Sequence, residues 1–217
     1  MQLRELHLLT GDLKGTFQFY KEVLDLSGTY NQAGCLSLMM GDTNIVFKSS
    51  GALQPYYHFA LDIPVNQFEA TMNWVGARVP LLPVPGSGFI ADFASWNARS
   101  FYFYDNNHNI VEFICRNDAD HRSAELEEAP GILYVSEIGI VTPDVTAFSD
   151  QLLERYNLEI FKKQPRQQNF TAIGDDRGLL IIAGLERNWY PTDKPSKSFP
   201  TKIVFHANGR EQELVIE

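Results

Sequence analysis

An internal repeat constrains the fold of this chain more than any other feature. Residues 3–12, LRELHLLTGD, match residues 135–144, VSEIGIVTPD, with Glu5 over Glu137. In each copy a strand of mixed apolar and polar residues runs into a helix, and the closing aspartate stands where a helix cap is expected. Because a repeat of this kind reflects duplication of one supersecondary unit, we expect a fold built from several copies of that unit.

The segments that follow extend the repeat to a β-α-β-β unit. The spacing of apolar residues predicts helices over 13–24 and 145–156. Each helix is followed by a predicted hairpin, over 35–48 in the first copy and 169–183 in the second, and each hairpin turns on a glycine-aspartate pair. A further strand is expected in the variable stretch between each helix and its hairpin.

Two more units complete the chain. Residues 57–63 predict a strand, 65–75 a helix and 101–115 a hairpin, which together make another unit of the same kind. Residues 202–217 predict only a hairpin, because an Asn-Gly pair lies between two strand-like segments and no helix follows. The fourth unit is therefore shortened.

A charged segment divides the chain. Residues 117–131 contain few side chains that could enter a core, which predicts a linker. We therefore expect residues 1–116 to form one complete two-module domain and residues 132–217 to form a truncated second copy.

Composition limits the partners. The net charge of -9 opposes binding to nucleic acid or to anionic lipid. The amino-terminal residues interrupt their apolar run with charge, unlike a secretory signal, and no run approaches the ~18 apolar residues of a membrane span. The two cysteines, Cys35 and Cys115, suit buried free thiols in a reducing compartment. We expect a cytoplasmic protein with no nucleic-acid or membrane partner.

Glu112 breaks the pattern of its own strand. Its neighbours in residues 109–115 are mostly apolar, so the segment reads as a strand buried on both faces. A buried carboxylate is costly unless a cation or several hydrogen-bond donors meet it. A metal ion is one such cation, but pairing with Arg or Lys, or simple exposure of the side chain, would account for Glu112 as well. His58, on the predicted strand 57–63, has the same ambiguity, because a lone histidine is often only structural.

Three segments together carry a family resemblance: the first strand with its closing aspartate, the helix segment FYKEVLDL at 19–26, and DNNHNIVEF at 105–113. They resemble the vicinal oxygen chelate superfamily, which includes glyoxalase I, extradiol dioxygenases, and fosfomycin- and bleomycin-resistance proteins. The resemblance covers residues 1–115 well and 132–205 in part. It implies an α+β fold in which paired βαβββ modules form a curved sheet around a cavity, with a truncated second glyoxalase-like copy.

The resemblance also implies a metal site. Metal-binding members place ligands on the first strands of two modules and on the last strand of the second, which on this chain are Glu5, His58 and Glu112. The fourth position used by glyoxalases falls on Phe47, which cannot coordinate a metal. Because dioxygenases have histidine where this chain has Glu5, redox iron chemistry is less favoured. The implied cofactor is a divalent ion, with Mn, Fe, Ni and Zn all open.

Strand parity is compatible with this ligand set. Side chains alternate between the two faces of a strand, so Glu5 and His7 share a face and all three candidate ligands can face one cavity. His7 is therefore a candidate general base, or a substitute ligand. Glu137 has the same context as Glu5, but Lys202 falls where a partner of His58 would be. We therefore expect no metal in the second half, and a structural role or contacts in a homodimer.

Two functions remain open. The first is a metal-dependent enzyme, lyase or dioxygenase-like, that acts on a small oxygen-bearing substrate by Lewis-acid catalysis. The second is a metal-free small-molecule binding protein of the bleomycin-resistance kind, with an aromatic cavity. The residues expected to line that cavity are Trp74, Phe89, Trp96, Tyr102 and Tyr104.

Overall fold

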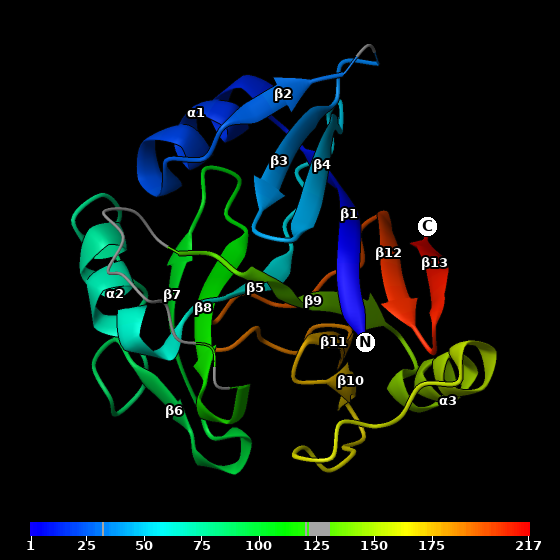
Figure 1. Cartoon of the computed structure of the whole chain (residues 1–217). Coiled ribbons are helices and arrows are strands. Elements are labelled where there is room, and N and C mark those ends of the chain that lie inside the picture. Colours follow the sequence, from blue (N-terminus) through cyan, green and yellow to red (C-terminus); the bar gives the residue numbers. More distant parts are fainter. Residues whose placement is uncertain (32, 120, 122–130) are drawn as a thin grey trace.

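The computed structural model describes residues 1–31, 33–119, 121 and 131–217, so most of the expected linker lies outside the described residues. The strands form two mixed sheets, ordered β13-β12-β1-β4-β3-β2 and β10-β11-β9-β5-β8-β7-β6 (Figure 1). Their bounds are β1 Gln2–Thr10, β2 Gly28–Tyr30, β3 Leu36–Met40, β4 Thr43–Ser49, β5 His58–Asp62, β6 Ala91–Phe93, β7 Ala98–Tyr104, β8 Ile110–Arg116, β9 Tyr134–Thr142, β10 Phe170–Asp175, β11 Gly178–Gly184, β12 Thr201–Ala207 and β13 Arg210–Ile216.

The helices begin where the repeat predicts. Helices α1 (Leu13–Leu24) and α3 (Val145–Tyr156) follow β1 and β9, and α2 (Phe68–Gly76) follows β5 after a short 3-10 turn. The carboxylates of Asp12 and Asp144 each accept a hydrogen bond of 2.9 Å from a backbone N–H in the first turn. These contacts satisfy donors that a helix start leaves unpaired, and they confirm both predicted caps.

The α+β fold of repeated modules is confirmed, but the modules pair differently from our expectation. Strand β1 pairs with β12, and β5 pairs with β9, so each sheet combines one module from residues 1–116 with one from residues 132–217. The expected two-module domain is thus divided between the sheets. A local repeat defines each module, whereas the choice between two similar first strands depends on long-range packing that the repeat does not encode.

The main core lies between the two sheets. It joins Leu6 and Phe205 of the six-stranded sheet to Phe59, Phe113 and Ile138 of the seven-stranded sheet. A second apolar cluster covers the other face of the seven-stranded sheet. Every residue of β5, β8 and β9 is buried, as expected for strands covered on both faces.

A glycine fixes one junction between the sheets. Gly41 has φ +59, and a Cβ atom there would lie 2.0 Å from the carbonyl oxygen of Leu133. The next residue, Asp42, donates its N–H to the same carbonyl at 2.8 Å. The turn between β3 and β4 can therefore approach the segment before β9 only because position 41 has no side chain.

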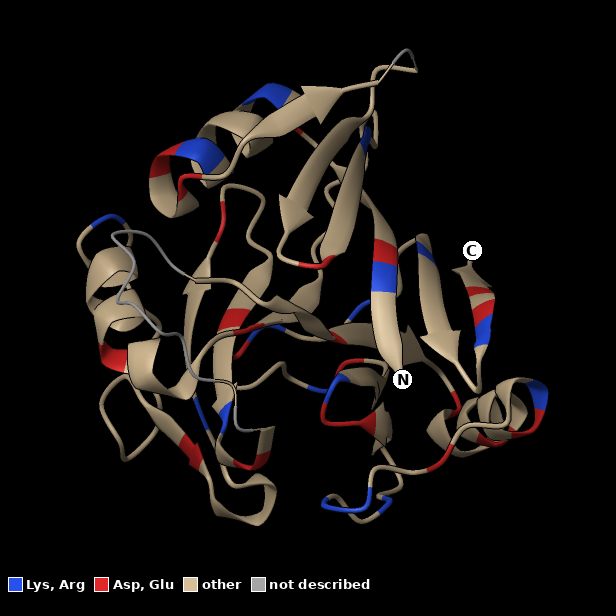
Figure 2. Ribbon diagram, in the orientation of Figure 1, with Lys and Arg blue, Asp and Glu red and all other residues tan. Residues whose placement is uncertain are grey.

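Charge is dispersed over the fold. Figure 2 shows acidic and basic residues interspersed along the described ribbon, without a helix or strand that is basic throughout. In the described part of the chain, no helix is long and apolar enough to cross a membrane.

Candidate metal centre

A row of side chains crosses the seven-stranded sheet. Glu137 of β9 pairs with Ala60 of β5, Ala60 pairs with Glu112 of β8, and Glu112 pairs with Tyr102 of β7. Residues in register project from the same face of a sheet. Ala60 has only a methyl group between the two glutamates, so their carboxylates can converge above it.

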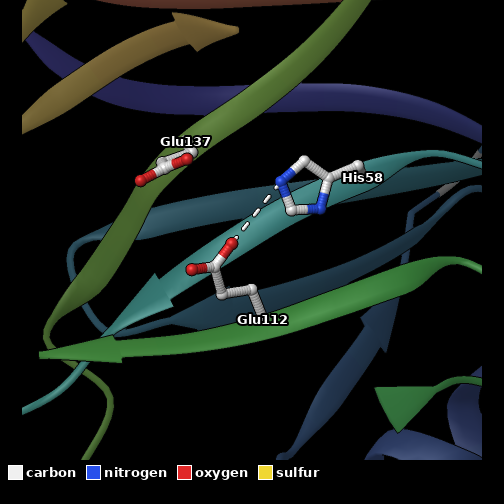
Figure 3. Close-up of side chains that lie close together, drawn as sticks. All are labelled: His58, Glu112 and Glu137. Atoms are coloured by element: carbon white, nitrogen blue, oxygen red, sulfur yellow. Dashed lines mark ion pairs between the residues drawn. The ribbon is translucent and has the colours of Figure 1, made fainter. Parts of the chain in front are cut away.

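His58 projects beside this row, two residues before Ala60 on the same strand. Its Nε2 lies 3.5 Å from Oε2 of Glu112 (Figure 3). Its Nδ1 lies 3.1 Å from the carbonyl oxygen of Ile110. A carbonyl oxygen can only accept, so Nδ1 carries the proton when the ring is neutral. The lone pair of Nε2 therefore faces the carboxylates.

His58, Glu112 and Glu137 form one buried group. Each offers a ligand atom, and these atoms all lie within 4.8 Å of one another. Among the described residues no other group of histidine, cysteine and acidic side chains meets this condition. One imidazole and two carboxylates are a donor set suited to a divalent transition metal, so the residues present fit such an ion.

Burial sets the protonation of the three groups. The pKa of Glu112 is raised to about 8 by burial and by the charge of Glu137. Burial also raises the pKa of Glu137, although the guanidinium of Arg116 opposes this effect. Burial lowers the pKa of His58 to about 4, against the effect of the Ile110 carbonyl. Without a cation, the imidazole is neutral and Glu112 holds a proton at neutral pH.

Arg116 holds the Glu137 carboxylate through a buried ion pair. Its guanidinium is fully buried, forms ion pairs with Asp62 and Glu137, the latter at 2.5 Å, and donates to the Ser136 hydroxyl at 3.0 Å. The fully ionised buried cluster contains three carboxylates, of Asp62, Glu112 and Glu137, against one guanidinium. Its excess of two negative charges equals the charge that one divalent cation would neutralise.

A cavity of about 260 Å³ opens onto the three side chains, which is small for a ligand pocket. One of its walls comes from the segment between β11 and β12. This segment is fastened to the sheet at two points: Tyr56 donates to the carbonyl of Pro195 at 2.6 Å, and Lys194 donates to the carbonyl of His108 at 3.2 Å. The other residues lining the cavity are mainly aromatic and include Phe93, Trp96, Tyr102, Phe170, Trp189 and Tyr190.

Glu5 and His7 lie elsewhere. Both are on β1 of the six-stranded sheet, where Oε1 of Glu5 is 2.5 Å from Nε2 of His7 and Oε2 accepts from Asn44 at 2.9 Å. Their side chains are more than a third exposed, and Glu5 lines a separate surface cavity with Lys202. They do share a face, as strand parity predicts. The structure does not bring either residue to the cavity of His58 and Glu112.

Of the five aromatic residues expected to line a cavity, only two line the cavity beside His58. Trp96 and Tyr102 line the cavity. Trp74 instead donates to the carbonyl of Val23 at 2.8 Å, and Phe89 is 49% exposed. Tyr104 packs edge-on against the His108 ring at the turn between β7 and β8. Phe47 is buried in the core between the sheets.

Glu137 is the residue that the sequence analysis left out of the site. The signal was present, since Glu137 matches Glu5 in the repeat, but the repeat does not say which first strand lies beside β5.

The same strand register locates a fourth position that could hold a metal ligand. In one module, Glu112 pairs with the residue two positions after His58 on β5. In the other, Ile181 of β11 pairs with Gly139, the residue two positions after Glu137, so Ile181 is the equivalent of Glu112. Ile181 lines the cavity but has no donor atom, so the site offers three protein ligands.

Two solved structures match most of this chain in fold. A candidate dioxygenase from Bacillus subtilis superposes with a TM-score of 0.63 at 13% identity, over 99% of this chain and 84% of that one. Glyoxalase I from Zea mays, as a V278E mutant, superposes with a TM-score of 0.55 at 12% identity, over 90% of this chain and 70% of that one. The chain therefore has the same fold as these two proteins. No protein-family model matches the sequence, and no curated protein matches it.

Proposed function

We propose that this chain is a metal-dependent enzyme that binds a divalent ion through His58, Glu112 and Glu137 and acts on a small oxygen-bearing substrate. The observation that carries the proposal is the buried group of His58, Glu112 and Glu137, whose ligand atoms lie within 4.8 Å of one another, with the Nε2 lone pair of His58 facing the carboxylates. Such a cluster is costly to bury unless protons or a cation neutralise it. Glu137 takes the place that the sequence analysis gave to Glu5, so Glu5 and His7 are not part of the proposal.

The chain's own groups would have separate tasks. The Ile110 carbonyl orients the His58 ring, and Arg116 holds the Glu137 carboxylate, so both donors are fixed before an ion arrives. Ile181 blocks the fourth protein position, which leaves coordination sites for substrate oxygens. A bound divalent ion would supply Lewis-acid polarisation of those oxygens.

Tyr102 would keep its proton near the reacting atoms. Burial, together with the charges of Glu112 and Glu137, raises its pKa well above the usual value, so its hydroxyl remains a donor at neutral pH. A substrate packed against the aromatic walls would displace water from the cavity, which would strengthen the electrostatic interactions at its floor.

Metal analysis tests the proposal. Protein purified without chelators is expected to contain close to one divalent ion per chain, and His58→Ala is expected to lose it. Glu137→Gln is expected to weaken metal affinity about 10-fold or more. Glu5→Gln is the matched control, since it removes the repeat-equivalent carboxylate, and it should retain the ion. Equal losses in Glu5→Gln and Glu137→Gln would contradict the assignment.

The aromatic walls support a second candidate, a metal-free protein that binds a small apolar molecule. The same preparations decide between the two. Wild-type protein that takes up no ion after incubation with Mn²⁺ or Zn²⁺, yet binds an aromatic ligand, would favour simple binding over catalysis.

A further inference from the structure

The remaining charged group of the cavity is Arg187, which comes from the segment between β11 and β12 and not from the strands that carry the candidate metal ligands. We propose that Arg187 is an anion-recognition residue, and that the substrate is a small, flat carboxylate whose adjacent oxygens reach the ion. This inference rests on the proposed function, because it assumes an ion at the floor of the cavity.

Arg187 is a half-buried cation that has no carboxylate partner among the residues that the structure describes. Its Nη1 donates only to the carbonyl of Asn188 at 3.3 Å, and its guanidinium lies 4.6 Å from the centre of the Phe170 ring. By contrast, Arg116, Arg99 and Arg166 each form an ion pair. Within the described residues, Arg187 forms no ion pair. Its remaining N–H donors are therefore available to a ligand in the cavity that it lines.

The positive charge acts on the site itself. The guanidinium of Arg187 contributes to the lowered pKa of His58, and burial lowers the pKa of Arg187. A half-buried cation with an apolar ring beside it is poorly solvated, and a ligand anion would compensate it. Arginine suits this task because its planar fork binds both oxygens of a carboxylate.

The walls indicate the shape of the ligand's body. The rings of Trp189 and Trp96 line a cavity of only about 260 Å³, which favours a flat, compact molecule. The floor alone would repel an anion, since Glu112 and Glu137 are acidic. A divalent ion removes this repulsion, so binding of an anionic substrate should require the ion as well as Arg187.

The test uses two probes that differ in charge and little else. The first is 2-hydroxybenzoate, and the second is its neutral analogue 2-hydroxybenzamide; both offer adjacent oxygens. Titration calorimetry on Mn²⁺-loaded wild-type protein should show at least about 10-fold tighter binding of the carboxylate. Arg187→Met should weaken carboxylate binding about 10- to 100-fold, as expected for loss of a charged hydrogen-bond donor, and change amide binding less than about 3-fold. Metal content should be unchanged.

Arg210→Met is the matched control, because it removes one exposed positive charge from β13, outside the cavity lining. It should leave both affinities unchanged. Equal binding of the two probes by metal-loaded wild-type protein, or binding of neither, would overturn the role of Arg187 while leaving the metal site intact. Failure to load metal would instead overturn the proposed function, and this inference with it.

Discussion

Arg116 and Glu137 are joined across 2.5 Å inside the seven-stranded sheet, one at the end of β8 and the other near the middle of β9. Both side chains are almost fully buried. The pair therefore connects the module that ends with β8 to the module that begins with β9. The same contact that holds these two modules together also positions Glu137, a candidate metal ligand.

Removing Arg116 should destabilise the protein strongly. Arg116→Met leaves Asp62 and Glu137 buried without their cation, and loss of one partner of a buried ion pair typically costs about 3–5 kcal/mol. Arg99→Met is the control, because the Arg99–Glu69 pair is partly exposed, unlike the fully buried Arg116, and should contribute at most about 1 kcal/mol. Urea unfolding of the metal-free proteins measures both changes. A cost for Arg116→Met no greater than that of the control would contradict the role assigned to the buried pair.

The local features of the fold could be predicted from the sequence. The bounds of α1 and α3 agree with the predicted ranges 13–24 and 145–156, because apolar spacing and a capping aspartate act within a few residues. The turn at Asn208-Gly209 also agrees, with φ values of 53° and 73°. His58 and Glu112 belong to one module, and the family resemblance, with which strand parity is compatible, implied that they share a face, as the strand register shows.

The third member of the site could not be predicted in this way. Glu5 and Glu137 occupy equivalent places in the repeat, and either first strand could have paired with β5. The choice depends on contacts between distant residues, such as Asp42 with Leu133 and Arg116 with Glu137. None of these contacts has a signature in a local pattern, so the repeat could not show that β9, and with it Glu137, lies beside β5.

Gly139 should be necessary for the shape of the cavity. A Cβ atom at this position would lie 2.6 Å from Cη2 of Trp189, whose ring covers the His58 ring at 5.2 Å between centres. Gly139→Ala should therefore displace Trp189, cost about 1–3 kcal/mol of stability and change the tryptophan fluorescence. Gly76→Ala, where the added atom would meet Leu81 no closer than 3.5 Å, is the control. Unchanged fluorescence and stability in Gly139→Ala would show that the ring is not held against β9.

Removing the charge of Glu112 should stabilise the metal-free protein at alkaline pH. The folded-state pKa of about 8 exceeds the usual 4.5, so between these values the folded state binds a proton that the unfolded state has lost. The stability of the wild type should fall as pH rises through this window, by at most ~1.4 kcal/mol per pH unit. Glu112→Gln cannot ionise, so with chelator it should melt above wild type at pH 8.5 and closer to it at pH 5. A mutant less stable than wild type at pH 8.5 would indicate that hydrogen-bond donors of the protein already stabilise the ionised carboxylate of Glu112 without a metal ion.

Metal affinity should rise with pH for the same reason. An ion must displace the proton of Glu112, so affinity should increase up to about tenfold per pH unit from pH 6 and level off near 8, where the carboxyl is already ionised. His58 adds no slope in this range, because its pKa of about 4 leaves the imidazole neutral throughout. Titrations of metal-free protein with Mn²⁺ in two buffers of different ionisation enthalpy would count the protons released, and about one is expected at pH 7. Glu112→Gln should bind Mn²⁺ more weakly and lose most of this pH dependence. Wild-type affinity that stays constant from pH 6 to 8 would contradict a protonated Glu112 in the metal-free protein.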